Sequence, residues 1–193
     1  MKKLAIFVSG NGTNMENILR HVREGKIRAE AALVLSDNPG APALERAKKF
    51  GVETVLVDRK KFAGREEFEK EIIRILEPKK IDYVILAGFM RILTPYFVRA
   101  YKNRTINLHP ALLPQFPGAH AIQEAWEARV QKTGVTVHFI DEGVDTGPVI
   151  LQREVPVEAG ETLESLEKKI HVVEYEIFPE AINLVLEGKT KAG

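Results

Sequence analysis

The segment LAIFVSGNGTN, residues 4–14, decides the fold class of this 193-residue chain more than any other stretch. Its first five residues are apolar and fit a buried strand, and the glycine-rich loop after them leads into a helical pattern over residues 14–23. Further strand-like runs lie at 31–35, 54–57, 83–87 and 105–108, and helical patterns lie between them at 42–50, 65–76 and 95–101. This alternation predicts an α/β fold, with a mostly parallel central sheet flanked by helices.

The rhythm changes after Pro117. The pattern there predicts a helix over 121–130, late antiparallel strands over 134–140 and 149–157, and a long helix over 162–186. Pro179 lies inside the last pattern and predicts a kink or a break, because proline removes a helical hydrogen bond. No repeat or long linker divides the sequence, so we expect one domain over residues 1–193.

The composition excludes several classes of protein. With 28 basic and 27 acidic residues and a net charge of +1, the chain gives no electrostatic reason to bind nucleic acid or a membrane. It contains no cysteine, which excludes disulfides and a thiolate nucleophile. The opening apolar run ends at Ser9, too early for a signal peptide, and no window approaches a membrane span. We therefore expect a cytoplasmic protein that acts on small molecules.

The segment INLHP, residues 106–110, places an amide and an imidazole two positions apart at the end of a strand. Because residues i and i+2 of a strand face the same side, Asn107 and His109 are expected to point at one substrate atom. An amide donor beside a proton-transferring imidazole suits a carbonyl under nucleophilic attack. His120 and His138, taken singly, are more typical of structural histidines.

Three loops are expected at the carboxyl edge of the parallel strands, where open α/β sheets bind ligands. The loop 9–14 contains two glycines and opens a helix, which favours a single phosphate group. A dinucleotide-binding loop is the competing interpretation, with Asp37 as the acid that would bind a ribose. Met15 stands where that motif needs glycine or alanine.

Two further loops each allow both a structural and a functional interpretation. Residues 88–93 are unusually apolar and would suit a flat aromatic ligand, although their spacing alone favours an extension of the core. Residues 141–148, DEGVDTGP, fit an acidic turn, and they also offer Asp145 as a carboxylate that would favour a charged imidazolium at His109. The spacing of these acids matches no calcium-binding loop.

The motifs NLHP (107–110), LLP (112–114) and DTGP (145–148) resemble the signature of the folate-dependent formyltransferases. The stretches GNGTN (10–14), AGFMRIL (87–93) and FPGAH (116–120) narrow the resemblance to the branch that formylates glycinamide ribonucleotide in purine synthesis. The resemblance runs essentially from end to end. It implies a single formyltransferase catalytic domain with a Rossmann-like fold.

The resemblance also implies a reaction. A formyl group moves from 10-formyltetrahydrofolate, the cosubstrate, to the amine of 5-phosphoribosylglycinamide through a tetrahedral intermediate. Asn107 and His109 would hydrogen-bond the intermediate's oxygen, and Asp145 would hold His109 protonated. No metal and no covalent enzyme intermediate is implied, and the protein is expected to be a monomer or a homodimer.

The binding roles implied by the resemblance fall into two sets. The substrate's phosphate and its sugar or amine end are assigned to Gly12, Thr13, Asn14 and Glu174. The folate is assigned to Arg65, Met90, Arg91, Ile92, Leu93, Asn107, Asp141, Glu142, Gly143, Val144 and Asp145. Arg65 is the candidate for the folate's carboxylate tail.

Three alternatives remain. A methionyl-tRNA formyltransferase shares the catalytic set but needs a basic nucleic-acid-binding domain, for which this chain has neither length nor charge. A 10-formyltetrahydrofolate hydrolase shares the core and normally carries an additional N-terminal regulatory domain. A non-catalytic nucleotide-binding module would need only the first loop, and it would leave the convergence of Asn107, His109 and Asp145 unexplained.

Overall fold

The computed structural model describes residues 1–190, which divide into two compact units, residues 1–106 and the residues from 107 onward. The first unit contains β1 (Lys2–Val8), α1 (Thr13–Arg23), β2 (Ala29–Ser36), α2 (Pro42–Lys48), β3 (Thr54–Leu56), η1 (Arg59–Lys61), α3 (Arg65–Leu76), η2 (Glu77–Lys79), β4 (Tyr83–Leu86) and α4 (Pro95–Ala100). The boundary falls inside β5 (Thr105–His109). The second unit continues with α5 (Ala121–Glu127), β6 (Lys132–Phe139), β7 (Val149–Pro156) and α6 (Leu163–Leu186).

The strands of residues 1–106 run parallel. β1 pairs with β2 on one side and with β4 on the other, and β2 pairs with β3. Ile6 lies at the centre of this sheet, opposite Val34 and Ile85. Every side chain from Leu4 to Val8 is fully buried, as expected for a parallel strand covered on both faces. The continuous apolar run in the sequence is therefore explained by two covering layers of helix.

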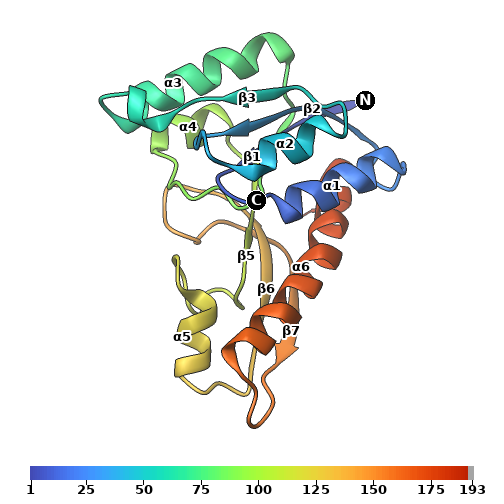
Figure 1. The fold of residues 1–193 in the computed structure, drawn as a ribbon, viewed down its shortest axis with the longest axis vertical. Helices are drawn as coiled ribbons and strands as arrows, with labels where there is room; N and C mark the ends of the chain where they lie inside the picture. Colours follow the sequence, from blue (N-terminus) through green and yellow to red (C-terminus); the bar gives the residue numbers. More distant parts are fainter. Residues whose placement is uncertain (191–193) are drawn as a thin grey trace. The chain divides into compact units, whose positions relative to one another are not determined.

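The helices of this unit form two groups. α1 packs against α2, and α3 packs against α4 (Figure 1). The chain order explains the grouping: β1 to β3 step in one direction, and the connection through α3 returns past β1 to β4. Because such crossovers are right-handed, a reversal of direction transfers the helix to the opposite face. Phe7 of β1 contacts Phe89 and Phe97 on the α4 side, with ring centroids 5.3 and 5.9 Å apart.

The reversal of strand order lies between β1 and β4, which creates the crevice where open α/β sheets bind ligands. The loops that leave these two strands lie side by side, because the Ser9 amide donates to the Gly88 carbonyl at 3.0 Å. The fold therefore presents both loops at a single edge of this unit.

In the second unit, β6 and β7 are antiparallel and α6 covers them, while α5 packs on α6 (Figure 1). The predicted break at Pro179 is wrong, since α6 is a continuous helix from Leu163 to Leu186. Pro179 is buried, as are its neighbours Ile177 and Phe178. Packing of this apolar face on the strands offsets the one hydrogen bond that the proline removes.

The predicted fold class is confirmed: the seven strands follow the order β3-β2-β1-β4-β5-β6-β7, mostly parallel with a late antiparallel pair. The predicted boundaries were within a few residues of the observed ones for most elements. None of the helices in residues 1–190 combines the length and apolar character that a bilayer crossing needs.

Candidate active site

The loop after β1 is shaped by Gly12, which has φ of 74°. A Cβ at this position would lie 2.5 Å from the Ala43 Cβ and 2.9 Å from the Met15 Cε. The turn and the close approach of α1 to α2 therefore require glycine here, whether or not a ligand binds. Gly10 differs, because a Cβ there would meet nothing within 4 Å. Of the two glycines in this loop, Gly10 is therefore the one for which packing gives no reason to require glycine.

The N-terminus of α1 has no side-chain cap. Gly12 is the N-cap and supplies no side-chain acceptor, so the first amides of the helix, beginning at Thr13, are not capped by that residue. Thr13 is exposed. Glu16 in the first turn is paired with Arg46 of α2, which neutralises the acid closest to this end. The geometry suits an anion held by backbone amides and the helix dipole.

Asp37, at the end of β2, connects the loops of the first unit. Its Oδ1 accepts a hydrogen bond from Ser9 Oγ at 2.6 Å, and its Oδ2 accepts one from Arg91 Nε at 2.7 Å. The Asp37 side chain is 2% exposed. A ribose-binding acid must have a free carboxylate at the crevice, so this structure argues against the dinucleotide interpretation.

The loop between β4 and α4 borders a pocket of about 270 Å³. The pocket combines apolar and aromatic side chains with three guanidinium groups and one carboxylate, from the residues Arg59, Arg65, Phe68, Glu69, Met90, Arg91, Ile92 and Leu93. Met90 is 74% exposed and Ile92 60% exposed, whereas Leu93 is buried. Extension of the core, which spacing alone favoured, is therefore correct for Leu93 and wrong for Met90 and Ile92.

The end of this loop is held by a buried acid. Glu69 of α3 is 1% exposed, and its carboxylate accepts hydrogen bonds from the amide and the hydroxyl of Thr94. Thr94 is the N-cap of α4, whose first helical residue is Pro95. The acid thus supplies the acceptor that the start of a short helix needs. The Glu69 carboxylate therefore holds both the end of the pocket-lining loop and the start of α4 in place.

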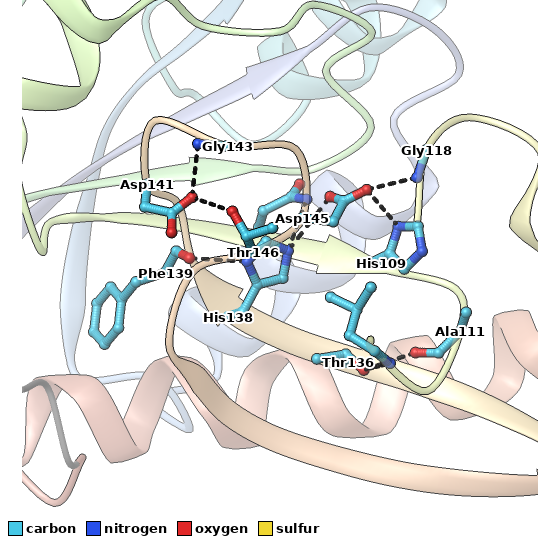
Figure 2. A network of polar contacts seen from close by, with 12 residues as sticks. His109, Ala111, Gly118, Thr136, His138, Phe139, Asp141, Gly143, Asp145 and Thr146 are labelled. Carbon is cyan, nitrogen blue, oxygen red and sulfur yellow. Dashed lines mark hydrogen bonds and ion pairs between the residues drawn. The ribbon is translucent and has the colours of Figure 1, made fainter. Parts of the chain in front are cut away.

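The second unit brings Asn107, His109 and Asp145 together, and adds His138 (Figure 2). His109 Nδ1 lies 3.5 Å from Asp145 Oδ2, and His138 Nε2 lies 3.7 Å from Asp145 Oδ1. Asn107 Nδ2 lies 3.3 Å from His138 Nε2. The amide and the first imidazole that the sequence paired are therefore linked to one carboxylate, directly or through a second imidazole.

Two backbone groups complete the surroundings of His109 and Asp145. His109 Nε2 lies 2.7 Å from the Phe116 carbonyl. The Gly118 amide donates to Asp145 Oδ2 at 2.8 Å (Figure 2). The carbonyl can only accept, so Nε2 carries a proton, while Nδ1 faces a carboxylate. Both ring nitrogens thus face acceptors, and this arrangement suits the imidazolium form of His109. Phe116 and Asp145 both have positive φ, 50° and 53°, conformations that non-glycine residues adopt at a cost.

The loop that contains Phe116 is held to the sheet by hydrogen bonds to Thr136 of β6. Its hydroxyl donates to the Ala111 carbonyl at 2.7 Å and accepts from the Leu113 amide at 3.1 Å (Figure 2). Gln152 of β7 donates to the Leu113 carbonyl at 2.8 Å. The loop over residues 110–117 is therefore anchored by two neighbouring strands.

The acidic loop between β6 and β7 is closed on itself. Asp141 Oδ1 accepts from the Gly143 amide at 3.0 Å and from Thr146 Oγ1 at 2.6 Å (Figure 2). A Cβ at Gly147 would lie 1.8 Å from the Phe139 carbonyl, so the loop returns against the strand end where only glycine fits. One oxygen of Asp141 is thus committed to the shape of the loop that places Asp145.

The electrostatics favour an ionised Asp145. Partial burial raises the pKa of this carboxyl, but the contact with His138, the Gly118 amide and the charges of both histidines together outweigh it and hold the pKa below its usual value. A carboxylate that stays charged beside two imidazoles can keep one of them protonated and accept a proton through water.

His138 is the residue that sequence reasoning missed. It lies on β6 where the register with β7 shifts, between Val137 and His138, and such irregularities re-aim side chains near active sites. Its buried neighbours Val135 and Val137 alternate with Thr136 and His138, which was a usable signal. A polar stripe of Thr136 and His138 on an otherwise apolar strand indicates a face directed at a polar site.

Glu174, assigned to the substrate, lies on α6 and is buried. His171, one turn earlier, has Nδ1 3.0 Å from a Glu174 carboxylate oxygen. That contact raises the pKa of His171, although partial burial lowers it. The helix therefore presents a pair of opposite charges rather than an isolated acid.

Residues 2–182 match the family described as Formyl transferase. The chain belongs to the formyl transferase family. It is 40% identical to the phosphoribosylglycinamide formyltransferase of Bacillus subtilis over 96% of this chain and 95% of that protein. It is 41% identical to the trifunctional purine biosynthetic protein adenosine-3 of Drosophila pseudoobscura pseudoobscura over 97% of this chain. The chain spans 14% of the length of that protein.

Solved structures of formyl transferases have the same fold. The glycinamide ribonucleotide transformylase 1 of Geobacillus kaustophilus is 46% identical, with a TM-score of 0.94, over 96% of this chain and 99% of that chain. The phosphoribosylglycinamide formyltransferase of Bacillus halodurans is 43% identical, with a TM-score of 0.94, over 99% and 98% of the two chains. The predictions of family and of an enzymatic, formyl-transferring class are therefore confirmed.

Within residues 1–190 of this formyl transferase, no three metal-type side chains gather into a group that could hold an ion. The second unit thus gathers three polar side chains around Asp145, and in the first unit the loop after β4 borders a pocket.

Proposed function

We propose that this protein transfers the formyl group of 10-formyltetrahydrofolate to the amine of 5-phosphoribosylglycinamide in de novo purine biosynthesis. The cluster of Asn107, His109, His138 and Asp145 carries the proposal. It supplies an amide donor, an imidazole with acceptors at both nitrogens, and a carboxylate with a lowered pKa. The names of the relatives, 40% identical over nearly the whole chain, support the choice of substrate.

The proposed chemistry is direct transfer. The substrate amine attacks the formyl carbon and forms a C–N bond, and the formyl oxygen gains negative charge. Asn107 and the His109 imidazolium donate hydrogen bonds to that oxygen, with the oxyanion replacing the Phe116 carbonyl as the acceptor for Nε2. Asp145 keeps His109 charged and accepts the amine's proton through water. Collapse breaks the bond to N10 of the folate, which takes up a proton.

The proposed binding roles follow the first unit. Gly12, Thr13 and Asn14 hold the phosphate at the N-terminus of α1, as the uncapped amides favour. The folate ring system lies against the exposed side chains of Met90 and Ile92, and Arg65 meets the carboxylate tail.

The remaining folate and substrate contacts lie in the second unit. We assign the loop from Asp141 to Asp145 to the folate, and Glu174 to the sugar or amine end of the ribonucleotide. Both ligands are small molecules, and we expect a cytoplasmic monomer or homodimer.

The test is an assay with 10-formyltetrahydrofolate and phosphoribosylglycinamide that follows the deformylated folate. The proposal predicts turnover that requires the amine and yields formylated ribonucleotide. Deformylation without the amine would identify a hydrolase instead. Absence of any deformylation would leave a non-catalytic binding protein. A substrate without its phosphate should show a KM raised by roughly a hundredfold if the α1 N-terminus holds that group.

A further inference from the structure

Three side chains of the first unit, Ser9, Asp37 and Arg91, form a polar chain that the proposed reaction does not use. Each comes from a different loop: Ser9 follows β1, Asp37 follows β2 and Arg91 follows β4. We call these three residues the loop anchor. Asp37 is its centre, with one carboxylate oxygen on Ser9 and the other on Arg91.

Both oxygens of the Asp37 carboxylate have a partner, and the side chain is removed from solvent. Its side chain is 2% exposed, and its two contacts measure 2.6 and 2.7 Å. A buried charge is tolerated only while its partners are in place, because its hydration has been given up. Displacement of either neighbouring loop would leave this charge unpaired. The anchor therefore selects one arrangement of the loops.

The Ser9 hydroxyl extends the anchor to the backbone of the loop after β4. It accepts a hydrogen bond from the Met90 amide at 2.8 Å while it donates to Asp37. The Ser9 amide donates to the Gly88 carbonyl at 3.0 Å. The backbone on both sides of Phe89 is thus fixed by one residue of the neighbouring loop.

The side chains that follow need such support. Met90 and Ile92 are 74% and 60% exposed. The free energy falls when apolar side chains leave water and fold back onto the protein. Loop ordering also costs conformational entropy for each residue that is fixed. The anchor resists both effects, because any collapse of this loop strains the hydrogen bond at Met90 or the ion pair at Arg91.

We propose that Asp37 is a positioning residue that holds the Met90–Leu93 loop in the conformation that receives the formyl-folate. This role rests on the proposed function and deepens it. The phosphate loop depends less on the anchor, since Gly12 is already fixed by its packing against Ala43. Loss of the anchor should therefore weaken folate binding selectively.

Asp37→Asn is the most discriminating variant. Its amide oxygen can still accept from Ser9, but its NH₂ group then faces the Arg91 Nε–H, a donor against a donor. The KM for 10-formyltetrahydrofolate should rise about tenfold, as expected for loss of one charge-assisted hydrogen bond, while kcat and the KM for the ribonucleotide change by less than about threefold.

Asp82→Asn is the matched control. The Asp82 carboxylate also makes two contacts, with Lys2 Nζ at 2.8 Å and with the Lys3 amide at 2.8 Å. It precedes β4, at the opposite end of the strand from the loop with Met90. A merely structural cost of losing a paired aspartate should appear in both variants, whereas a folate-specific KM effect should appear only in Asp37→Asn.

A second readout is independent of activity. Hydrogen exchange measured by NMR reports the Met90 amide directly, and both Asp37→Asn and Ser9→Ala should accelerate its exchange by about tenfold or more relative to Asp82→Asn. The two substitutions should be non-additive, because they break the same chain. Ser9→Ala keeps the question answerable if Asp37→Asn does not fold.

The outcomes separate the two claims. Folate KM and Met90 exchange that change in Asp37→Asn but not in Asp82→Asn support the proposal. Equal KM values in the two variants, with a wild-type enzyme that transfers formyl, overturn it while the function stands. If the wild type transfers no formyl, the proposed function fails, and unchanged Met90 exchange in both anchor variants overturns the anchor as well.

Discussion

Two buried or half-buried aspartates, Asp37 and Asp145, show how differently the two units use a carboxylate. Asp37 is 2% exposed, and both of its oxygens are engaged at 2.6 and 2.7 Å. Asp145 is 14% exposed, and its two histidines lie at 3.5 and 3.7 Å. The first is held by two short side-chain contacts and is shielded from solvent, whereas the second is more exposed and its two histidines lie farther away. A buried, closely paired carboxylate fixes geometry, and a more open one beside two imidazoles is available for chemistry.

The backbone around the two groups follows the same division. Asp37 directly follows the parallel strand β2, whereas Asp145 has φ of 53° in a loop that is closed by Asp141 and packed at Gly147. Strained non-glycine conformations persist where the surroundings over-determine them. Two of the five such residues within residues 1–190, Phe116 and Asp145, lie at the cluster around His109.

Asp145→Asn should give the largest loss. The amide has nearly the same shape but no charge to hold His109 protonated, so kcat should fall roughly a thousandfold with both KM values within about threefold of wild type. Steady-state kinetics with Asp82→Asn as control measures this. Near-normal turnover in Asp145→Asn would remove the carboxylate from the mechanism.

His138→Gln should lower kcat by roughly thirtyfold. The imidazole links Asn107 to Asp145, and its loss frees the amide and weakens the charge that keeps the pKa of Asp145 low. Because both residues act in one network, the double variant with Asp145→Asn should be hardly slower than Asp145→Asn alone. Additive losses would show that His138 acts separately from Asp145.

Gly12→Ala should destabilise the protein by about 2–3 kcal/mol, through positive φ and overlap with Ala43 and Met15. Gly10→Ala is the matched control, since a Cβ there meets nothing within 4 Å. Urea denaturation of the two variants measures the difference. Equal stabilities would contradict the packing explanation of Gly12.

His171→Gln should give the smallest effect, limited to acidic pH. The contact with Glu174 raises the pKa of His171 above 6.5, so its stabilisation is fully present below that pH and disappears as pH rises through the folded pKa. The imidazole is half exposed, which keeps the effect small. Urea midpoints near pH 5.5 should be lower for the variant, and those near pH 9 should coincide; a reversed order would refute the assigned direction.

Most of the fold could be predicted from the sequence, because the periodicity of apolar residues is a local signal. The buried run Leu4–Val8 and the alternation after it predicted a parallel sheet, and the structure contains it. The break predicted at Pro179 does not occur. The cost of a helical proline is local, whereas the packing that offsets it comes from β6 and β7. Tertiary contacts of this kind leave no mark within the helix's own sequence.

The candidate site was predicted in part. Strand alternation indicated that Asn107 and His109 act together, and the acidic loop over residues 141–148 offered Asp145 as a carboxylate for His109. His138 was missed because its partners are 31 and 7 residues away, and only the pairing of strands brings them together. Asp37 entered the sequence analysis only through the competing dinucleotide interpretation, and its engagement by Ser9 and Arg91 depends on three loops that meet only in the folded unit.

One kinetic comparison tests the division between the two carboxylates most directly. Asp37→Asn and Asp145→Asn are assayed side by side for kcat and for the KM of formyl-folate and of the ribonucleotide. The account predicts opposite profiles: a raised folate KM with kcat nearly unchanged for Asp37→Asn, and a greatly reduced kcat with KM nearly unchanged for Asp145→Asn. The same profile in both variants would contradict it.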